Sequence, residues 1–289
     1  MKKAEKLSLD FRRLMETQNF KSEEDLRKFM DSMVGQTIPS FPEETLSPKE
    51  KAQDLVYSAY EMNATKAKQN IKHALELDPD CIEAYEYLAG SEKKFKKIYS
   101  FYLQGIEIGQ RLFGGKFLEE SKGHFWLIHE TRPYLRCMSG LADCLVAMGM
   151  IREAAFIVEE ILILNKGDNM GVRYPLQSYY IYLNDHQALT ALDAIFEGDK
   201  RSYYLFNRAL HAYATVGDSE EARRMVVAAQ ERNKFVARRL VYRLPSLPIE
   251  DYVRMGSDEE ADYYVSFARL AWDSKEGAID WLAANMLPL

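Results

Sequence analysis

A short apolar signature in the second half of the chain recurs at a constant spacing, and this repeat restricts the possible folds more than any other feature. Its first copy has small and aliphatic residues on both sides of a glycine, namely Leu141, Ala142, Leu145, Gly149, Ala154, Val158 and Ile161. A step of about 34 residues, a length known from helical repeat proteins, gives a second copy formed by Leu176, Tyr179, Leu183, Ala188, Leu192 and Ile195. The same step gives a third copy formed by Leu210, Tyr213, Gly217, Ala222, Val226 and Ala229. Each copy therefore predicts two antiparallel helices joined by a short turn.

The small residues of the signature, Ala142, Ala154, Ala188, Ala222 and Ala229, allow two helix axes to approach closely. One such hairpin cannot bury its own apolar face, so neighbouring hairpins must stack. The repeat length and the spacing of its small and aromatic residues resemble the tetratricopeptide repeat (TPR). The expected fold is all-α, a right-handed TPR superhelix of antiparallel helix pairs with an N-terminal helical extension and C-terminal capping helices.

The remaining sequence divides around this block of repeats. Near the N-terminus, Leu7 and Phe11 stand at the spacing of an amphipathic helix. Ser47, Pro48 and Glu50 form an N-terminal capping box, which marks the start of the main body. The predicted regions are a helical extension (1–36), a Pro-containing linker (37–46), two TPR-like repeats (47–109), an insertion (110–133), three repeats in register (134–233), and a loop with a C-terminal cap (234–289).

Composition and charge exclude several classes of protein. A net charge of -6 and a pI near 5.6 argue against a general nucleic-acid binder or a protein that binds anionic membranes. The longest apolar run, 157–164, contains two glutamates and is too short to cross a bilayer. The charged first residues show no apolar leader, and Cys81, Cys137 and Cys144 are an odd number of thiols without a paired spacing. Reduced thiols in a cytoplasmic protein are the expected state, with these cysteines serving as small core residues.

Several longer motifs resemble one group of proteins more narrowly. They are Gly105-Ile-Glu-Ile-Gly109, Gly123-His-Phe-Trp126, Glu130-Thr-Arg-Pro-Tyr134, the Gly140-Leu-Ala block and Asn169-Met-Gly-Val-Arg-Tyr174. Together with Ala74-Leu-Glu-Leu-Asp-Pro79, they are similar to a group of mostly bacterial TPR proteins whose biochemical role is not assigned. The resemblance implies an all-helical interaction scaffold, and it supplies neither catalytic residues nor a metal.

The strict register of the repeat allows the lining of a ligand groove to be predicted. TPR proteins generally hold a peptide on the face formed by the first helix of each pair. Polar and aromatic residues one turn from the core stripe would form this face, and Arg173, Asn207 and Arg208 would bind a carboxylate of the ligand. Alternatively, these arginines pair with neighbouring acidic residues on a solvated face. The predicted groove residues are Arg136, Ser139, Asp143, Arg173, Tyr174, Gln177, Tyr180, Tyr204, Asn207, Arg208 and His211.

The insertion carries a second cluster of polar and aromatic side chains. It consists of His124, Trp126, His129, Glu130 and Arg132. His129 and Glu130 could act as an acid–base pair, but a hydrogen-bonded cluster that braces the insertion explains the same residues. The spacing of His124 and His129 does not place two metal ligands on one helix face, and Gly114-Gly115 lacks the partners of a phosphate-binding loop. The sequence therefore predicts no catalytic residue, metal or cofactor.

These observations favour a non-enzymatic cytoplasmic scaffold that binds a protein or peptide, with an acidic or carboxylate-bearing ligand in the groove. Two alternatives stay open. One is an enzyme or nucleotide-linked regulator that uses His124, His129 and Glu130; a deep pocket at these residues would favour it. The other is a homo-oligomer in which the N-terminal helices pack on another copy. Nucleic acid and membranes are not expected partners.

Overall fold

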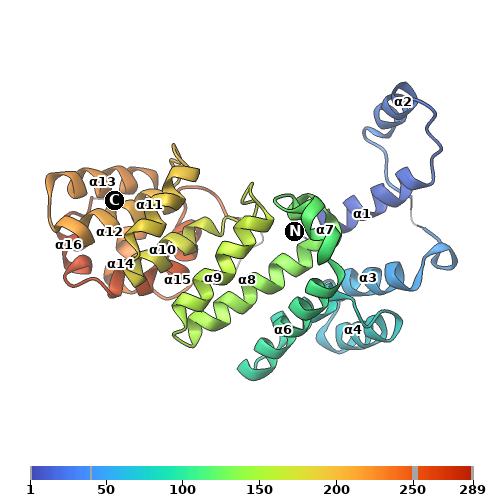
Figure 1. Ribbon diagram of the computed structural model, residues 1–289, viewed down its shortest axis with the longest axis horizontal. Coiled ribbons are helices and arrows are strands. Elements are labelled where there is room, and N and C mark those ends of the chain that lie inside the picture. The colour runs from blue at the N-terminus through green and yellow to red at the C-terminus, as the bar shows by residue number, and fades with distance from the viewer. Residues whose placement is uncertain (1, 40, 249–252, 288–289) are drawn as a thin grey trace. The chain divides into compact units, whose positions relative to one another are not determined.

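The computed structural model describes residues 2–39, 41–248 and 253–287, and within these ranges the chain is all-helical with no strand (Figure 1). The chain divides into two compact units, Met1–Cys144 (unit 1) and Leu145–Leu289 (unit 2). The division falls within the block that the sequence analysis treats as three continuous repeats. We describe each unit by itself.

Unit 1 contains two N-terminal helices followed by antiparallel pairs. Its helices are α1 (Lys2–Glu16), α2 (Glu23–Met33), α3 (Pro48–Ala59), α4 (Ala64–Leu77), α5 (Ile82–Ser91), α6 (Phe95–Leu112), the short α7 (Gly115–Ser121) and α8 (Arg132–Ala147), whose last residues belong to unit 2. Helix α3 packs against α4, and α5 packs against α6. The predicted capping box is confirmed, because the Ser47 side chain accepts a bond from the backbone N–H of Glu50 and the Glu50 side chain bonds back to Ser47.

The glycines of the Gly105-Ile-Glu-Ile-Gly109 and Gly140-Leu-Ala motifs lie where α6 meets α8. A Cβ atom on Gly109 would lie 2.1 Å from the ring of Tyr134, and one on Gly140 would lie 2.3 Å from the ring of Tyr102. Each glycine therefore makes room for a tyrosine of the opposite helix. These two motifs, which carry part of the family resemblance, therefore have a packing role in this chain, because their glycines let α6 and α8 approach each other closely.

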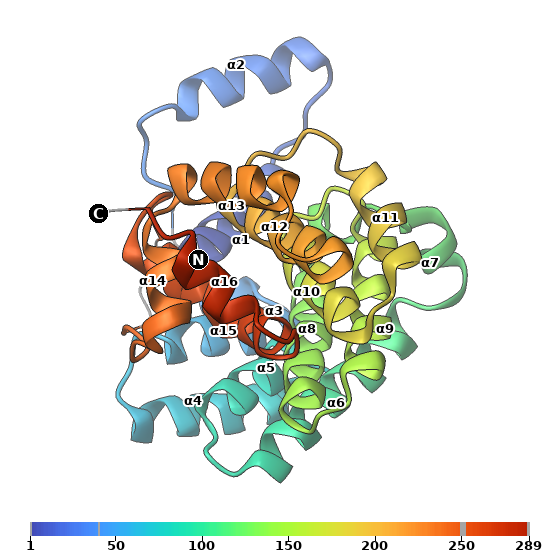
Figure 2. The same cartoon turned by 90° about the vertical axis from the view of Figure 1, so that its left-hand side faces the viewer.

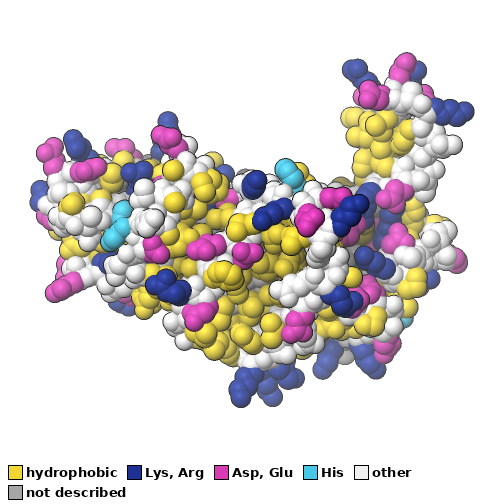
Figure 3. Space-filling model, in the orientation of Figure 1, with side chains coloured by type: hydrophobic (Ala, Val, Ile, Leu, Met, Phe, Trp, Pro, Cys, Tyr) yellow, Lys and Arg dark blue, Asp and Glu magenta, His cyan; other side chains and the backbone are white. Residues whose placement is uncertain are grey.

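The two N-terminal helices differ in how they are buried. Helix α1 buries Glu5, Leu9 and Arg13, and Leu7, which we expected on its apolar face, is 57% exposed. The expectation was wrong because charged partners on other helices hold α1, so its inner face is the Glu5–Leu9–Arg13 stripe. Helix α2 buries no residue, and both views show it standing apart from α3–α6 (Figures 1 and 2). Apolar side chains remain exposed along α2 (Figure 3).

Unit 2 consists of short antiparallel helices and a C-terminal set. The helices are α9 (Ile151–Leu164), α10 (Arg173–Leu183), α11 (His186–Ile195), α12 (Ser202–Val216), α13 (Glu220–Arg232), α14 (Phe235–Tyr242), α15 (Asp258–Asp273) and α16 (Ala278–Ala284). The predicted turns are confirmed near Gly149 and at Gly217-Asp218, which separate α8 from α9 and α12 from α13. Ser257 caps α15, its side chain accepting a hydrogen bond from the backbone N–H of Glu260. Part of the predicted loop between α14 and α15, 249–252, lies outside the described residues.

The repeating apolar stripe forms most of the core of unit 2. Val158, Leu176, Leu210 and most of their equivalents are almost fully buried, whereas Leu183, Ala188 and Tyr213 are partly buried. Ile195 departs most from the pattern, with 71% of its surface exposed. It is the last residue of α11, so the helix ends before its side chain can reach the next pair.

Helices α15 and α16 cover the inner face of α10 and α12. Tyr264 and Trp272 of α15 are completely buried, and the Tyr203 and Tyr264 rings stack with centroids 5.9 Å apart. Aromatic burial of this extent is among the largest contributions a single side chain makes to a core. The C-terminal helices are thus an integral part of unit 2.

The three cysteines are free and buried, which confirms the prediction of small core thiols. Within the described ranges, no helix is both long and apolar enough to span a membrane.

Candidate functional site

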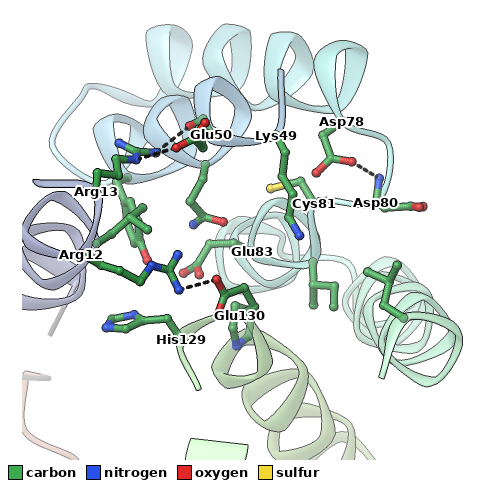
Figure 4. Close-up of a pocket in the computed structure, with 16 residues that line it drawn as sticks. Arg12, Arg13, Lys49, Glu50, Asp78, Asp80, Cys81, Glu83, His129 and Glu130 are labelled. Atoms are coloured by element: carbon green, nitrogen blue, oxygen red, sulfur yellow. Dashed lines mark hydrogen bonds and ion pairs between the residues drawn. The ribbon is translucent and has the colours of Figure 1, made fainter. Parts of the chain in front are cut away.

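A cavity of about 250 Å³ lies in unit 1 between α1, α3, the start of α5 and the end of the insertion. Figure 4 shows its charged lining, with Arg12 and Arg13 from α1, Lys49 and Glu50 from α3, and Glu130 opposite them. We call this space the unit 1 cavity. It contains residues of three regions that are distant in sequence, so only the folded chain creates it.

Helix α1 is bound beside this cavity by a buried carboxylate. Glu5 is 5% exposed, and its Oε1 atom accepts a hydrogen bond of 2.8 Å from Arg136 Nη1 of α8. Arg132, one turn earlier on α8, lies 3.8 Å from the same oxygen. Arg136 also donates to Glu83 at 3.0 Å and to Glu86 at 2.8 Å. One guanidinium thus joins the N-terminal helix to α5 and α8.

Three cations of α1 form further ion pairs along its length. Lys2 pairs with both Glu83 and Glu86, the second at 3.0 Å. Arg12 Nη1 lies 2.5 Å from Glu130, and Arg13 Nη1 lies 2.9 Å from Asp54 of α3. The pairs of Lys2 and Arg13 are largely buried, and a buried ion pair loses much of its attraction to the cost of lost hydration. They specify the position of α1 better than they stabilise it.

The electrostatic field in this cluster follows from burial and from the neighbouring charges. Burial lowers the pKa of Arg136, but the carboxylates of Glu83, Glu86 and Glu5 raise that pKa by more, so the guanidinium stays charged. Burial raises the pKa of Glu86, and the negative charge of Glu83 adds to this effect, whereas Arg136 and Lys2 oppose it. The cluster is therefore held together by the two cations between its carboxylates.

The insertion cluster predicted from sequence is partly assembled. His129 and Glu130 line the unit 1 cavity, whereas His124 is exposed outside it. Arg132 Nε donates to the Trp126 carbonyl at 2.8 Å and its guanidinium lies over the indole ring, which confirms that these two brace the insertion. The cavity is the feature that favours the enzyme alternative.

Titration of the two candidate acid–base residues is set by their surroundings. Burial and the positive charge of Arg132 lower the pKa of His129, so the ring is neutral at neutral pH. Burial raises the pKa of Glu130, but backbone hydrogen bonding and Arg12 lower it by more, and the carboxylate is ionised. Burial raises the pKa of the nearby Cys81 thiol to about 12, so it is no thiolate nucleophile at neutral pH.

In unit 2, several predicted groove residues lie inside the fold. Gln177 and Asn207 are each 1% exposed and bond to each other at 3.2 Å. The Asn207 Oδ1 atom also accepts bonds from Ser178 and from Tyr264 of α15. The face predicted to receive a peptide is therefore covered by α15 of the same chain.

The predicted carboxylate-binding arginines of unit 2 have internal partners or neighbours. Arg173 bonds to Asp168 at 2.7 Å and to Asp199 at 2.8 Å. It therefore has acidic partners, as the alternative expected, but they are neither Asp143 nor Glu residues, and the Arg173 side chain is only 14% exposed rather than on a solvated face. Arg208 is exposed and bonds to the Tyr204 hydroxyl at 3.2 Å. The remaining predicted residues of unit 2 are Tyr174, bonded to Asp199, Tyr180, bonded to Glu159, and His211, bonded to His186.

Three predicted groove residues lie in unit 1. Arg136 is bound to Glu5, Ser139 is partly exposed and Asp143 is exposed. The sequence analysis missed Glu5 and Glu83. Glu5, Leu9 and Arg13 stand four residues apart on one face of α1, and this spacing could have identified the buried face of the helix. It does not identify the residues that contact that face. Within the described residues, no group of three or more His, Cys, Asp or Glu side chains could hold a metal.

No family model, curated protein or solved structure matches the chain. What it does must follow from its own side chains.

Proposed function

We propose that the chain is a non-enzymatic, cytoplasmic binding protein of TPR type that holds a helical segment of a partner protein in unit 1. The binding surface would be the side of α3, α5 and α8 that carries Asp54, Glu83, Glu86, Arg132 and Arg136, which we call the α1-binding face. In a TPR superhelix these three are first helices of successive pairs, the elements that receive ligands.

One observation carries the proposal: Arg136 already binds a carboxylate of a helix, that of Glu5 in α1. The sequence predicts Arg136 as a groove residue and an acidic or carboxylate-bearing peptide as the ligand of the groove. Helix α1 is a model of such a ligand, because its buried stripe contains one apolar residue between two charged ones. A partner helix with Glu, Leu and Arg at the same spacing would meet the same surface.

The TPR arrangement itself is supported by the equivalent positions of the repeat. Ala154 and Ala222, which the register places in the second helix of their pairs, are both fully buried in α9 and α13. Helix α10 packs against both α11 and α12, as successive pairs of a stacked array require.

The proposal is tested by cutting the chain between α2 and α3. A protease recognition site inserted between Gln36 and Thr37 separates α1 and α2 from the rest without changing a contact of α1. A dye on Ser32→Cys of the exposed α2 then reports binding of the released segment by fluorescence anisotropy. We expect reversible, saturable binding that weakens as salt rises, because ion pairs form most of the contact. Failure of the segment to rebind the cut protein would exclude the α1-binding face as a site for helices.

A matched pair of substitutions identifies the group that matters. Glu5→Gln retains the shape of the side chain and removes its charge, so we expect about tenfold weaker binding of the segment. Glu16→Gln removes the same charge from an exposed position, 68% accessible, and should leave affinity nearly unchanged. Equal affinities for the two variants would contradict the proposal.

A second candidate function is acid–base chemistry by His129 and Glu130, favoured by their shared position in the unit 1 cavity. Neutral His129 would take a proton from a bound substrate. The test is turnover of a panel of ester and phosphoester substrates by the full chain. Activity lost in His129→Gln and kept in His124→Gln would support this function, and no turnover by the native chain would remove it.

A further inference from the structure

We propose that the unit 1 cavity is a binding site for a small monocarboxylate, formed by Arg12 of α1, Lys49 and Gln53 of α3, and His129 of the insertion. This site differs from the α1-binding face. It exists with α1 in place, and its ligand would contact residues that do not take part in holding Glu5.

The cavity has hydrogen-bond donors that lack acceptors. Four buried nitrogen atoms of lining residues form no hydrogen bond within the described part of the chain, namely Arg12 Nε, Arg13 Nε, Gln53 Nε2 and His129 Nε2. The nearest carboxylate to Arg12 Nε, that of Glu16, is 3.8 Å away, which is too long for a hydrogen bond. A buried donor without a partner costs free energy, so these groups favour a ligand that supplies oxygen acceptors.

Lys49 adds a positive charge to the same space. Its side chain extends from α3 toward the middle of the cavity (Figure 4), and it forms no ion pair with any described residue. Arg13, by contrast, already pairs with two carboxylates, since its Nε lies 3.2 Å from Glu50 and its Nη1 lies 2.9 Å from Asp54, although Nε forms no hydrogen bond. Lys49 is therefore the lining cation that is free to pair with a ligand.

The carboxylates of the lining already have partners. Glu83 is held by Lys2 and Arg136, Glu130 by Arg12, and Asp80 by Arg111. Glu50 is bound to Ser47 and Arg13, and Asp78 accepts the backbone N–H of Asp80. The unused hydrogen-bonding capacity of the lining thus belongs mainly to nitrogen atoms.

Charge and size then select the ligand. The lining contains five acidic residues against Arg12, Arg13 and Lys49, so its net charge is negative and any anion meets some repulsion there. A dianion such as phosphate meets more of it than a single carboxylate, which Lys49 and the unpartnered donors must outweigh. A cavity of about 250 Å³ is smaller than the usual pocket for a drug-sized ligand. A short carboxylic acid, or the carboxylate of one acidic side chain, fits both limits.

Such a ligand would add to the ion pairs that already join these elements, Arg12 to Glu130 and Arg13 to Asp54. Arg12 belongs to α1, whereas Lys49, Gln53 and His129 belong to other parts of unit 1. By linkage, a ligand that needs α1 in place stabilises α1 on the α1-binding face. This coupling rests on the proposed function, but binding of the carboxylate itself does not.

The experiment uses the full chain, labelled with ¹⁵N and ¹³C at histidine. Propionate is titrated against chloride at constant ionic strength, and the ring signals of His129 and His124 are followed by NMR. We expect saturable shifts of the His129 signals alone, and a rise in the pKa of His129 because the bound anion favours the imidazolium. Phosphate should bind more weakly than propionate at the same ionic strength.

Substitutions on one helix provide the control. Lys49→Met should weaken propionate binding roughly fivefold or more, since it removes a charge-assisted bond. Lys51→Met removes an equal charge two residues away, outside the cavity, and should leave the affinity unchanged. Gln53→Leu, which removes only an unpartnered donor, is the second variant should Lys49→Met lower the folded fraction.

Three results would overturn the proposal: unsaturable shifts, equal affinity in Lys49→Met and Lys51→Met, or phosphate binding at least as tight as propionate. The released N-terminal segment is assayed without propionate, so failure of this site leaves the test of the α1-binding face intact. Conversely, the NMR titration stands whether or not that segment rebinds.

Discussion

The two units cover their inner helices in opposite ways. In unit 1, α1 buries Glu5, Leu9 and Arg13, a stripe with two charges and one apolar residue. In unit 2, α15 buries mainly aromatic and small apolar residues, among them Tyr264 and Trp272, although Asp258 and Asp262 of the same helix also pair with the buried Arg239. Both helices come from a chain terminus and both lie against the helices that the repeat predicts as a groove.

The contacts of α1 and of α15 differ in how easily they can break and form again. Apolar burial removes area from water and is lost only when the unit opens, so α15 belongs to the core. An ion pair leaves two groups that water can hydrate again, and its net contribution is small once lost hydration is counted. A helix held mainly by charges can therefore leave without unfolding its unit. This contrast is what makes unit 1, rather than unit 2, the better place for a ligand.

The largest effect expected is in α15. Trp272→Ala removes a completely buried indole and its bond to the Tyr264 hydroxyl, 2.9 Å long, and should lower the free energy of unfolding by about 3–5 kcal/mol. Leu9→Ala, the equivalent truncation in α1, should cost clearly less. Urea unfolding monitored by circular dichroism measures both. Equal losses would mean that α1 is as much a core element as α15.

A second substitution tests the packing of α6 against α8, the helix that contributes Arg132 and Arg136 to the α1-binding face. Gly109→Ala places a methyl group against the Tyr134 ring, so α6 and α8 must separate, and the cost should be about 1–3 kcal/mol. Gly90→Ala, in α5, meets no atom within 4 Å and is the control. A helical glycine replaced in open space should be neutral or stabilising by about 0.5–1 kcal/mol. Thermal unfolding of both variants measures these two changes in stability.

Salt should separate the two terminal helices directly. Raising ionic strength screens the ion pairs of α1 and leaves the aromatic contacts of α15 intact. Hydrogen exchange measured by mass spectrometry should therefore become faster in α1 at high salt while α15 stays protected. The expected change for α1 is severalfold, consistent with about 1 kcal/mol of weakened pairing. Unchanged exchange in α1 would place its stability in contacts other than the ion pairs.

The smallest expected effect is that of pH on stability, and it should have the same direction in both units. Burial lowers the pKa of His129 in unit 1 and of His211 in unit 2 below the ordinary value of 6.5. The folded form then binds fewer protons than the unfolded chain, so these histidines contribute stability above pH 6.5 that is lost as pH falls through their folded pKa. His129→Gln and His211→Gln should each reduce the loss of unfolding free energy between neutral and mildly acidic pH. His124→Gln, at an exposed position, is the control.

Much of the helical architecture could be predicted from sequence because its signals are local. Ser47 and Ser257 cap helices with their own side chains, and the Gly149 and Gly217 turns follow from a backbone conformation that glycine adopts readily. The stripe through Leu176 and Leu210 repeats at a fixed period, so it identified the buried side of each helix. The prediction that Ile195 is buried was wrong because a repeat period does not show where a helix ends, and Ile195 is the last residue of α11.

The candidate site could be predicted only in part. Arg136, His129 and Glu130 were identified as polar residues near a break in the pattern, but their partners Glu5 and Arg12 are more than a hundred residues away. Asn207 had the polarity of a groove residue, yet it bonds to Tyr264 in the interior. Polarity alone does not distinguish a side chain that faces a ligand from one that faces another helix.

The sequence by itself determined that this protein is built from helical hairpins, since helix caps, turns and apolar spacing act within a few residues. Only the tertiary structure decided that α1 and α15 cover the predicted groove positions of their units, one through charges and one through aromatic rings. Such contacts depend on which distant segments meet, and a pattern of residue types does not contain that information.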